Sequence, residues 1–305
     1  MKSRKQAIAA TLLAGLLWGS SFVVIKVGLE TIDPYWFAFL RFAVATVIAV
    51  SYAAATGRLR VVGALLRRPI VILFGVFNGL GFILQFKGQT MTTAGKAALF
   101  VNVSTIFVAI GSRFMFRERF GALKVVAVVA GMAGVFLVTT GGRLEIASRT
   151  QFVGDLIVLA GAVAWTFFIL LDKKIVHGTE VDIRALTAAQ VLLTTATALP
   201  AALLFAPHAF PAGDASWWAI LYTAVFCTVI PFMLWTSGLR YISATVSSVI
   251  LLVEILYAVA LAAVLLGERL TTGGIVGGGL IAVAAYLATR GEVEMTAPGP
   301  DFVPE

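Results

Sequence analysis

Charged side chains are scarce in this chain. Asp, Glu, Lys and Arg make up 12% of the 305 residues, hydrophobic residues make up 60%, and the mean hydropathy is +0.99. A soluble domain usually carries about 25% charged residues. This shortage excludes an ordinary soluble fold and predicts an all-α integral membrane protein.

Cysteine and histidine are also almost absent. The single cysteine, Cys227, excludes an internal disulfide and a thiolate metal cluster, and His177 and His208 both fall in predicted loops. No metal-ligand spacing, phosphate-binding glycine loop or nucleophile motif occurs. We therefore expect no cofactor, no metal and no enzymatic activity.

The net charge of +8 could suggest a nucleic-acid partner. No basic face with interleaved aromatic residues accompanies it, so we expect no nucleic acid. Lys and Arg at the ends of membrane helices set the orientation of a membrane protein instead. The partners expected are the lipid bilayer and a small-molecule substrate.

What the chain does contain is a repeat. The phrases "FMFRERF" and "VLLGERL" recur 150 residues apart, so that Glu118 and Arg119 correspond to Glu268 and Arg269. Each phrase ends one apolar segment and precedes another. A duplicated membrane unit is typical of a transporter.

Ten apolar segments are long enough to cross the hydrocarbon core of a bilayer. Lys and Arg concentrate in alternate loops, which predicts that both termini are cytoplasmic. Because each repeat holds five spans, an odd number, the second repeat inserts upside down relative to the first. The spans are predicted at 7–29, 35–54, 69–86, 94–114, 121–140, 154–171, 185–205, 216–238, 244–266 and 272–289.

The domain organisation follows from these spans. We expect a first repeat over 1–141, a linker over 142–153, a second repeat over 154–290 and a disordered cytoplasmic tail over 291–305. The tail is polar and contains proline, which is typical of a disordered terminus.

Glu254 lies near the middle of segment 244–266 and is the most informative single residue. An ionisable side chain there costs about 2.5–3.5 kcal/mol, so it needs a partner or a wet cavity. It is predicted to couple transport to protons or to anchor a substrate amine. The alternative is a neutral Glu that bonds a neighbouring helix. Ser247 and Tyr257 share its face and join it as candidate cavity residues.

A second polar stripe follows segment 69–86. Asn78 and Gln85 are seven residues apart, with Phe82 between them on the same face, and Asn102 lies in the next segment. The stripe indicates a cavity wall. Hydrogen bonding between helices is the alternative.

Other residues inside the spans have a functional and a structural interpretation. Arg41 could bind a substrate carboxylate or snorkel to an interface, and we expect a structural or gating role. Trp18, Trp165 and Trp235 either stack on a substrate or serve as packing. Pro231 should kink or break its helix, as a gating joint or as a static bend.

The repeated Glu-Arg phrases fall at corners between helices, on opposite faces of the membrane. We expect Glu118, Arg119, Glu268 and Arg269 to be gating or structural residues rather than part of an active site. Each Glu is predicted to lie near the start of the next helix, where the helix dipole favours an anion, and each Arg at the lipid headgroups.

Several phrases in order resemble the drug/metabolite transporter superfamily, specifically its EamA-like ten-helix transporters. The resemblance covers roughly residues 6–290 and rests on "LLWGSSFVVIKVGL", "FLRFAVA", "TTAGKAALFVNVSTIFVAI", "GAVAWTFFILLDKKI" and "SATVSSVILLVEILYAVALAAVLLGERL". It implies two inverted five-helix repeats around a central cavity. The first, third, fourth, sixth, eighth and ninth spans would mainly line that cavity, and the fifth and tenth would be peripheral.

This chain departs from the family pattern in two places. Relatives often carry Glu-Pro in the ninth span and a proline at the equivalent point of the fourth. Here Ile255 follows Glu254, and Thr105 stands at the fourth-span position. Without those prolines, both helices are predicted to be unbroken and straighter.

The leading functional hypothesis is a carrier in the inner cell membrane that exports a small metabolite by alternating access, with an amino acid or related amphiphilic compound as cargo. Multidrug or quaternary-amine efflux is the alternative of the same class. A membrane enzyme acting on lipid and a non-transporting scaffold are alternatives of other classes. The expected oligomeric state is a monomer or a homodimer.

Overall fold

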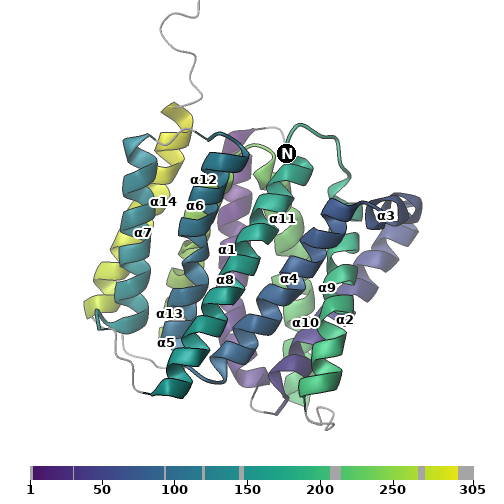
Figure 1. Ribbon diagram of the computed structural model, residues 1–305, viewed down its shortest axis with the longest axis horizontal. Helices are drawn as coiled ribbons and strands as arrows, with labels where there is room; N and C mark the ends of the chain where they lie inside the picture. The colour runs from purple at the N-terminus through teal and green to yellow at the C-terminus, as the bar shows by residue number, and fades with distance from the viewer. Residues whose placement is uncertain are drawn as a thin grey trace, which may run out of the picture.

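The computed structural model describes residues 3–29, 31–92, 94–118, 121–143, 148–206, 214–266 and 272–294. These residues form an upright bundle of helices, and no strand occurs among them (Figure 1). The helices are α1 Arg4–Gly28, α2 Pro34–Ala55, α3 Leu59–Leu66, α4 Pro69–Gln89, α5 Ala94–Asn102, α6 Ser104–Met115, α7 Ala122–Thr140, α8 Arg149–Val176, α9 Ile183–Phe205, α10 Asp214–Ala224, a π-helical turn Val225–Val229, α11 Ile230–Leu239, α12 Ala244–Leu251, α13 Val253–Leu266 and α14 Thr272–Glu294.

Within those ranges, nine helical segments are long and apolar enough to cross a membrane. The sequence predicted ten spans, and α1 is the predicted span that is not among the nine. Three of the nine are composite, because α5 runs on into α6, α10 continues through the π-helical turn into α11, and α12 runs on into α13. Exposed large side chains such as Phe114, Val129, Leu204 and Val264 are apolar, as expected of a surface that faces lipid.

The bundle has two ends, which we name by the chain termini. At the terminal end α1 begins and α14 finishes, and at the distal end α1 finishes and α14 begins (Figure 1). The first helices of the two halves, α1 and α8, run in opposite directions through the bundle. Ala7, early in α1, and Lys173, late in α8, both contact the last residues of α11 at the terminal end.

The helix contacts between the two halves come in matching pairs, in which a helix of one half packs on the equivalent helices of the other. Helix α1 packs on α11 and α13, whereas α8 packs on α4 and α6; α2 packs on α9, and α7 on α14. The same exchange holds for side chains. The rings of Trp18 and Phe232 lie edge to face at 5.5 Å between centroids, and those of Trp165 and Phe82 do so at 4.8 Å. The two halves thus cross-pack with approximate two-fold symmetry.

The prediction of unbroken fourth and ninth spans is wrong. The first is interrupted at Val103 and the second at Leu252. The N–H of Val103 is shared between the carbonyls of Leu99 and Phe100, and the N–H of Leu252 reaches back only three residues, to Val249. These bonds tighten the helix locally, so each break forms without a proline.

Tight packing of α1 accompanies the second break. A Cβ added to Gly19 would lie 2.5 Å from the carbonyl oxygen of Glu254 and 2.7 Å from Cβ of Tyr257. Gly15, one turn earlier, faces Leu251 and the backbone nitrogen of Glu254. A pair of small residues therefore allows the backbone of α1 to reach the interrupted part of the ninth span.

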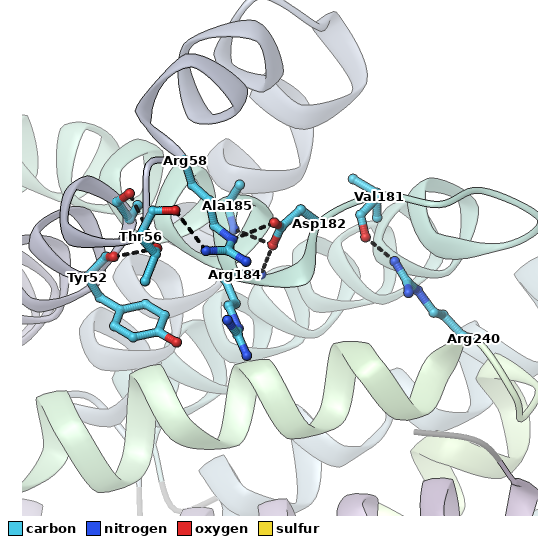
Figure 2. A network of polar contacts seen from close by, with 9 residues as sticks. Tyr52, Thr56, Arg58, Val181, Asp182, Arg184, Ala185 and Arg240 are labelled. Atoms are coloured by element: carbon cyan, nitrogen blue, oxygen red, sulfur yellow. Dashed lines mark hydrogen bonds and ion pairs between the residues drawn. The ribbon is translucent and has the colours of Figure 1, made fainter.

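At the terminal end, polar contacts join the start of α3 to the start of α9 (Figure 2). The carboxylate of Asp182 caps α9 by accepting from the N–H groups of Arg184 and Ala185, and it forms an ion pair with Arg58 at 2.6 Å. Burial alone would raise the pKa of Asp182, but these hydrogen bonds outweigh it and lower the pKa below its ordinary value of 3.8. Arg240 also donates to the carbonyl of Val181.

Candidate functional site

A cavity of about 610 Å³ lies inside the bundle. Its central part is aromatic, and helices from both halves contribute to it. The rings form a connected group in which Phe168 stacks on Trp235 at 5.5 Å and meets Trp165 edge to face at 5.4 Å. The aromatic lining residues are Trp18, Phe82, Phe86, Trp165, Phe168, Phe232 and Trp235.

The cavity extends to the distal end and not to the terminal end. Its lining includes Leu29, Gln89 and Thr139, which lie at the distal ends of α1, α4 and α7. Towards the terminal end the helices are joined by polar contacts. Nζ of Lys173 donates to the carbonyl oxygens of Leu239 and Ile242 at 2.6 and 2.9 Å. These contacts therefore close the bundle at its terminal end.

Glu254 brings a carboxylate to this cavity. It is the second residue of α13, directly after the interruption of the ninth span, and it lines the cavity. Its side chain has no hydrogen bond or ion pair to any residue that the structure describes. A carboxylate inside a membrane protein that lacks a protein partner is available to a substrate, a proton or water.

Arg41 lies in the cavity wall beside a break in α10–α11. Pro231 has no N–H, so the carbonyl of Cys227, four residues earlier, lacks its usual helical donor. Nη2 of Arg41 donates to that carbonyl at 2.7 Å and Nε donates to the hydroxyl of Thr228 at 2.8 Å. Nε1 of Trp18 donates to the same carbonyl at 3.0 Å. The π-helical turn is thus held from α1 and α2.

Comparison with known proteins places the chain in a family. The profile of the EamA-like transporter family matches residues 5–140 and again 152–290. The chain belongs to the EamA-like transporter family. It is a multi-pass membrane transporter, and its two family matches correspond to the two cross-packed halves.

Curated relatives match this EamA-like transporter over nearly their whole length. An "Uncharacterized transporter" of Archaeoglobus fulgidus is 28% identical, with 95% of this chain and 98% of the relative covered. A "Probable amino-acid metabolite efflux pump" of Salmonella typhimurium is 30% identical, with 95% and 96% covered. A solved crystal structure shares the fold at a TM-score of 0.82, with 20% identity and 97% and 100% of the two chains covered.

Eight of the residues singled out from the sequence line the cavity of this EamA-like transporter. They come from α1, α2, α4, α5, α8, α11 and α13, and the structure brings them around one space. They are Trp18, Arg41, Phe82, Gln85, Asn102, Trp165, Trp235 and Glu254. Arg41 is only 2% exposed and does not snorkel to an interface.

Three predicted cavity residues are not among the lining residues. Asn78 is fully buried and donates to the hydroxyl of Thr194 at 2.9 Å, which joins α4 to α9. Ser247 lies behind the wall, where its hydroxyl accepts from Nε1 of Trp235 at 2.8 Å. Tyr257 packs in an apolar cluster that includes residues of α1, α5, α7, α13 and α14. Helical spacing put these residues on a polar face without revealing which neighbouring helix that face meets.

Glu118 contacts the starts of two helices. It lies near the start of α7, as predicted, where it pairs with Lys124 at 4.0 Å. Its carboxylate also accepts from the N–H of Ala244 at 3.2 Å and the hydroxyl of Thr245 at 2.9 Å, at the start of α12. That helix start offers free N–H groups to an anion, and Glu118 reaches it across the two halves. Arg119, Glu268 and Arg269 lie outside the described residues.

The sequence analysis did not single out five charged residues that the structure buries. Lys124 and Lys173 lie near the predicted ends of spans, where a cation is expected to reach the interface, yet they are 2% and 6% exposed. Lys96 and Asp155 form a buried ion pair at 3.5 Å. Asp172 received no attention, although it is fully buried, accepts from the hydroxyl of Thr236 at 2.7 Å and has no partner at Oδ1 among the residues described. Its position inside the apolar run "FFILLDKKIV" was the available signal.

The set of lining helices is slightly wider than the resemblance implied. Besides the expected helices, α2 contributes Arg41, and α7 contributes Val138 and Thr139 at its distal end, whereas α14 contributes no lining residue over its described part. In the described ranges, no three His, Cys, Asp or Glu side chains come together as a candidate metal site. The groups that could bind a ligand in the cavity are aromatic rings, side-chain amides, Arg41 and Glu254.

Proposed function

We propose that this protein is a carrier of the inner cell membrane that exports a small metabolite, an amino acid or a related amphiphilic compound, by alternating access. In this proposal α1 is a tenth span and both termini are cytoplasmic, so the terminal end is the cytoplasmic end. The two inverted halves rock around the central cavity, which binds the substrate. The carrier works as a monomer or a homodimer.

One observation carries this proposal. A cavity of about 610 Å³ has lining residues up to the distal end of the bundle, whereas the terminal end is joined by polar contacts such as those of Lys173. A closed end and an accessible end are what one state of an alternating-access carrier requires. The volume is within the range that small-molecule sites usually have, about 300–1,000 Å³.

The chemistry of the cavity supports an amphiphilic substrate. Aromatic rings supply a large apolar surface, and Glu254 offers an anionic acceptor for an amine. Nε1 of Trp165 has no acceptor among the described residues and supplies a donor. The Salmonella relative named "Probable amino-acid metabolite efflux pump" supports the same cargo class.

Efflux from proteoliposomes tests this function. The vesicles hold the purified protein and an equal mixture of the twenty amino acids, and mass spectrometry follows the loss of each compound. We expect one amino acid or a small group to leave faster than from protein-free vesicles. Equal loss of all twenty from both preparations would remove the amino-acid proposal.

Quaternary-amine efflux is the second candidate, because aromatic rings around one carboxylate suit organic cations. Glu254 with Trp18 and Trp165 is the arrangement that favours it. Adding a fluorescent quaternary ammonium dye to the same vesicles separates the two candidates. Dye efflux without amino-acid efflux would favour this second function.

A further inference from the structure

The two halves correspond residue by residue. The second family match begins 147 residues after the first (residues 152 and 5) and ends 150 residues after it (residues 290 and 140). Asp33 and Asp182, which cap α2 and α9 through equivalent hydrogen bonds, are 149 residues apart. The exchanged pairs Trp18–Phe232 and Trp165–Phe82 fit these spacings. Each residue of the first half can therefore be assigned a counterpart.

In the centre of the cavity both members of a corresponding pair line the wall. Trp18 and Trp165 do so, and so do Phe82 and Phe232, and Ser104 and Glu254. Towards the distal end, several first-half residues line the cavity without their counterparts, and those from the first and third spans are Ile25, Leu29, Phe86 and Gln89. Those counterparts lie in the closed terminal end, and they are Asp172, Val176, Thr236 and Leu239.

The counterparts contact one another across the closed end. Oδ2 of Asp172 accepts from the hydroxyl of Thr236 at 2.7 Å, and Nζ of Lys173, the next residue, donates to the carbonyl of Leu239 at 2.6 Å. Asp172 is 0% and Val176 1% exposed. When the halves exchange conformations, these contacts must separate just as Ile25 and Phe86 are separated here.

We propose that Asp172 is a substrate-binding carboxylate, which faces the pathway only when the cavity opens at the terminal end and which receives the ammonium group of the substrate there. The assignment rests on the alternating-access function proposed above. It adds that the two mouths differ in chemistry, because the counterpart of Asp172 at the distal mouth is the apolar Ile25.

The state of the Asp172 side chain supports this role. Its Oδ1 has no hydrogen-bond partner among the described residues, and a buried, unpaired carboxylate oxygen is costly. The neighbouring cation Lys173 is directed to the carbonyl groups of Leu239 and Ile242 at the end of α11. Asp172 therefore keeps an acceptor position that a ligand can occupy once the terminal end opens.

Charge-selective thiol labelling tests the assignment. Val176→Cys places a thiol one helical turn after Asp172, and Leu29→Cys places one at the counterpart position of the distal mouth. Each variant is placed in oriented proteoliposomes with the exported amino acid present. It is then treated with a cationic or an anionic methanethiosulfonate that cannot cross the membrane, and the rate of labelling is measured. The wild type, whose single Cys227 is fully buried, measures background labelling.

Three results are expected. Val176→Cys reacts from the terminal side and prefers the cationic reagent by about tenfold, the effect of a carboxylate within one helical turn. Adding Asp172→Asn abolishes that preference at Val176→Cys and leaves the charge preference at Leu29→Cys unchanged. In the Asp172→Asn variant, the KM for the exported amino acid rises while transport through the distal mouth remains.

Other outcomes overturn the assignment. If Val176→Cys reacts but its charge preference survives Asp172→Asn, the carboxylate does not face the pathway. If Val176→Cys never reacts while the wild type transports, the terminal mouth is built from other residues. If the wild type transports no amino acid or dye at all, the proposed function fails and the assignment fails with it.

Discussion

Nη2 of Arg41 lies 2.7 Å from the carbonyl oxygen of Cys227, an atom that lost its helical donor to Pro231. A buried cation in α2 therefore supplies the hydrogen bond that a proline in the eighth span removes. The pair joins α2 to the π-helical turn between α10 and α11, in the wall of the cavity. This relationship gives a first prediction.

Arg41→Ala should lower the free energy of unfolding by about 1–3 kcal/mol, because it removes two buried hydrogen bonds from a charged donor. Pro231→Ala restores an N–H opposite the Cys227 carbonyl, so Arg41→Ala should cost less in that background. Unfolding of the single and double variants in detergent measures this coupling. Strictly additive effects would show that Arg41 does not act through the bond that Pro231 removes.

Glu254→Gln should make export insensitive to a pH gradient while substrate exchange across the vesicle membrane continues. The reason is that an amide side chain at this position would still bind a polar group but could not exchange a proton. Ser104→Ala is the matched control, because Ser104 lines the cavity at the counterpart position of the first half. Undiminished gradient-driven export by Glu254→Gln would exclude Glu254 as the coupling residue.

Gly19→Ala should destabilise the protein by about 1–3 kcal/mol, because its methyl group would overlap backbone atoms of the ninth span. The new Cβ would lie 2.5 Å from the carbonyl oxygen of Glu254. Gly279→Ala is the control: nothing lies within 4 Å of a Cβ at that position, so the higher helix propensity of Ala should leave stability unchanged or raise it. Thermal unfolding in detergent compares the two, and equal effects would contradict the close approach of α1.

Asp182→Asn should lower stability at pH 7 by about 0.5–1 kcal/mol, because it removes the partly exposed ion pair with Arg58 but keeps a side-chain cap on α9. The pKa of Asp182 lies below its ordinary value of 3.8. The carboxylate therefore contributes fully above that value and loses its contribution as pH falls through the lowered pKa. Unfolding measured from pH 7 downwards should show wild type and variant converging in this acid range. A constant difference at every pH would point to the cap and not to the charge.

The elements that depend on composition and spacing could be predicted from the sequence. Long apolar runs predict membrane helices because the bilayer leaves few alternatives. The repeated phrase around Glu118 gave the correspondence between the halves. The interruptions at Val103 and Leu252 could not be predicted, because they depend on packing against other helices and not on a local proline.

The candidate site was predictable in part for a related reason. A polar residue in an apolar helix must find a partner or a cavity, and the sequence does not say which. Glu254 lines the cavity, whereas Asn78 meets Thr194 on a neighbouring helix. Asp172 was overlooked because it is followed by two lysines, a pattern typical of the end of a span.

The exchanged pairs Trp18–Phe232 and Trp165–Phe82 have an evolutionary consequence. In the proposed alternating-access cycle, each mouth of the cavity is formed mainly by one half of the chain. A difference such as Ile25 in the first half against Asp172 in the second then changes the side chain that the carrier exposes on one side of the membrane and leaves the other side unchanged. Inverted halves of this kind would let selection change substrate uptake on one side and substrate release on the other independently.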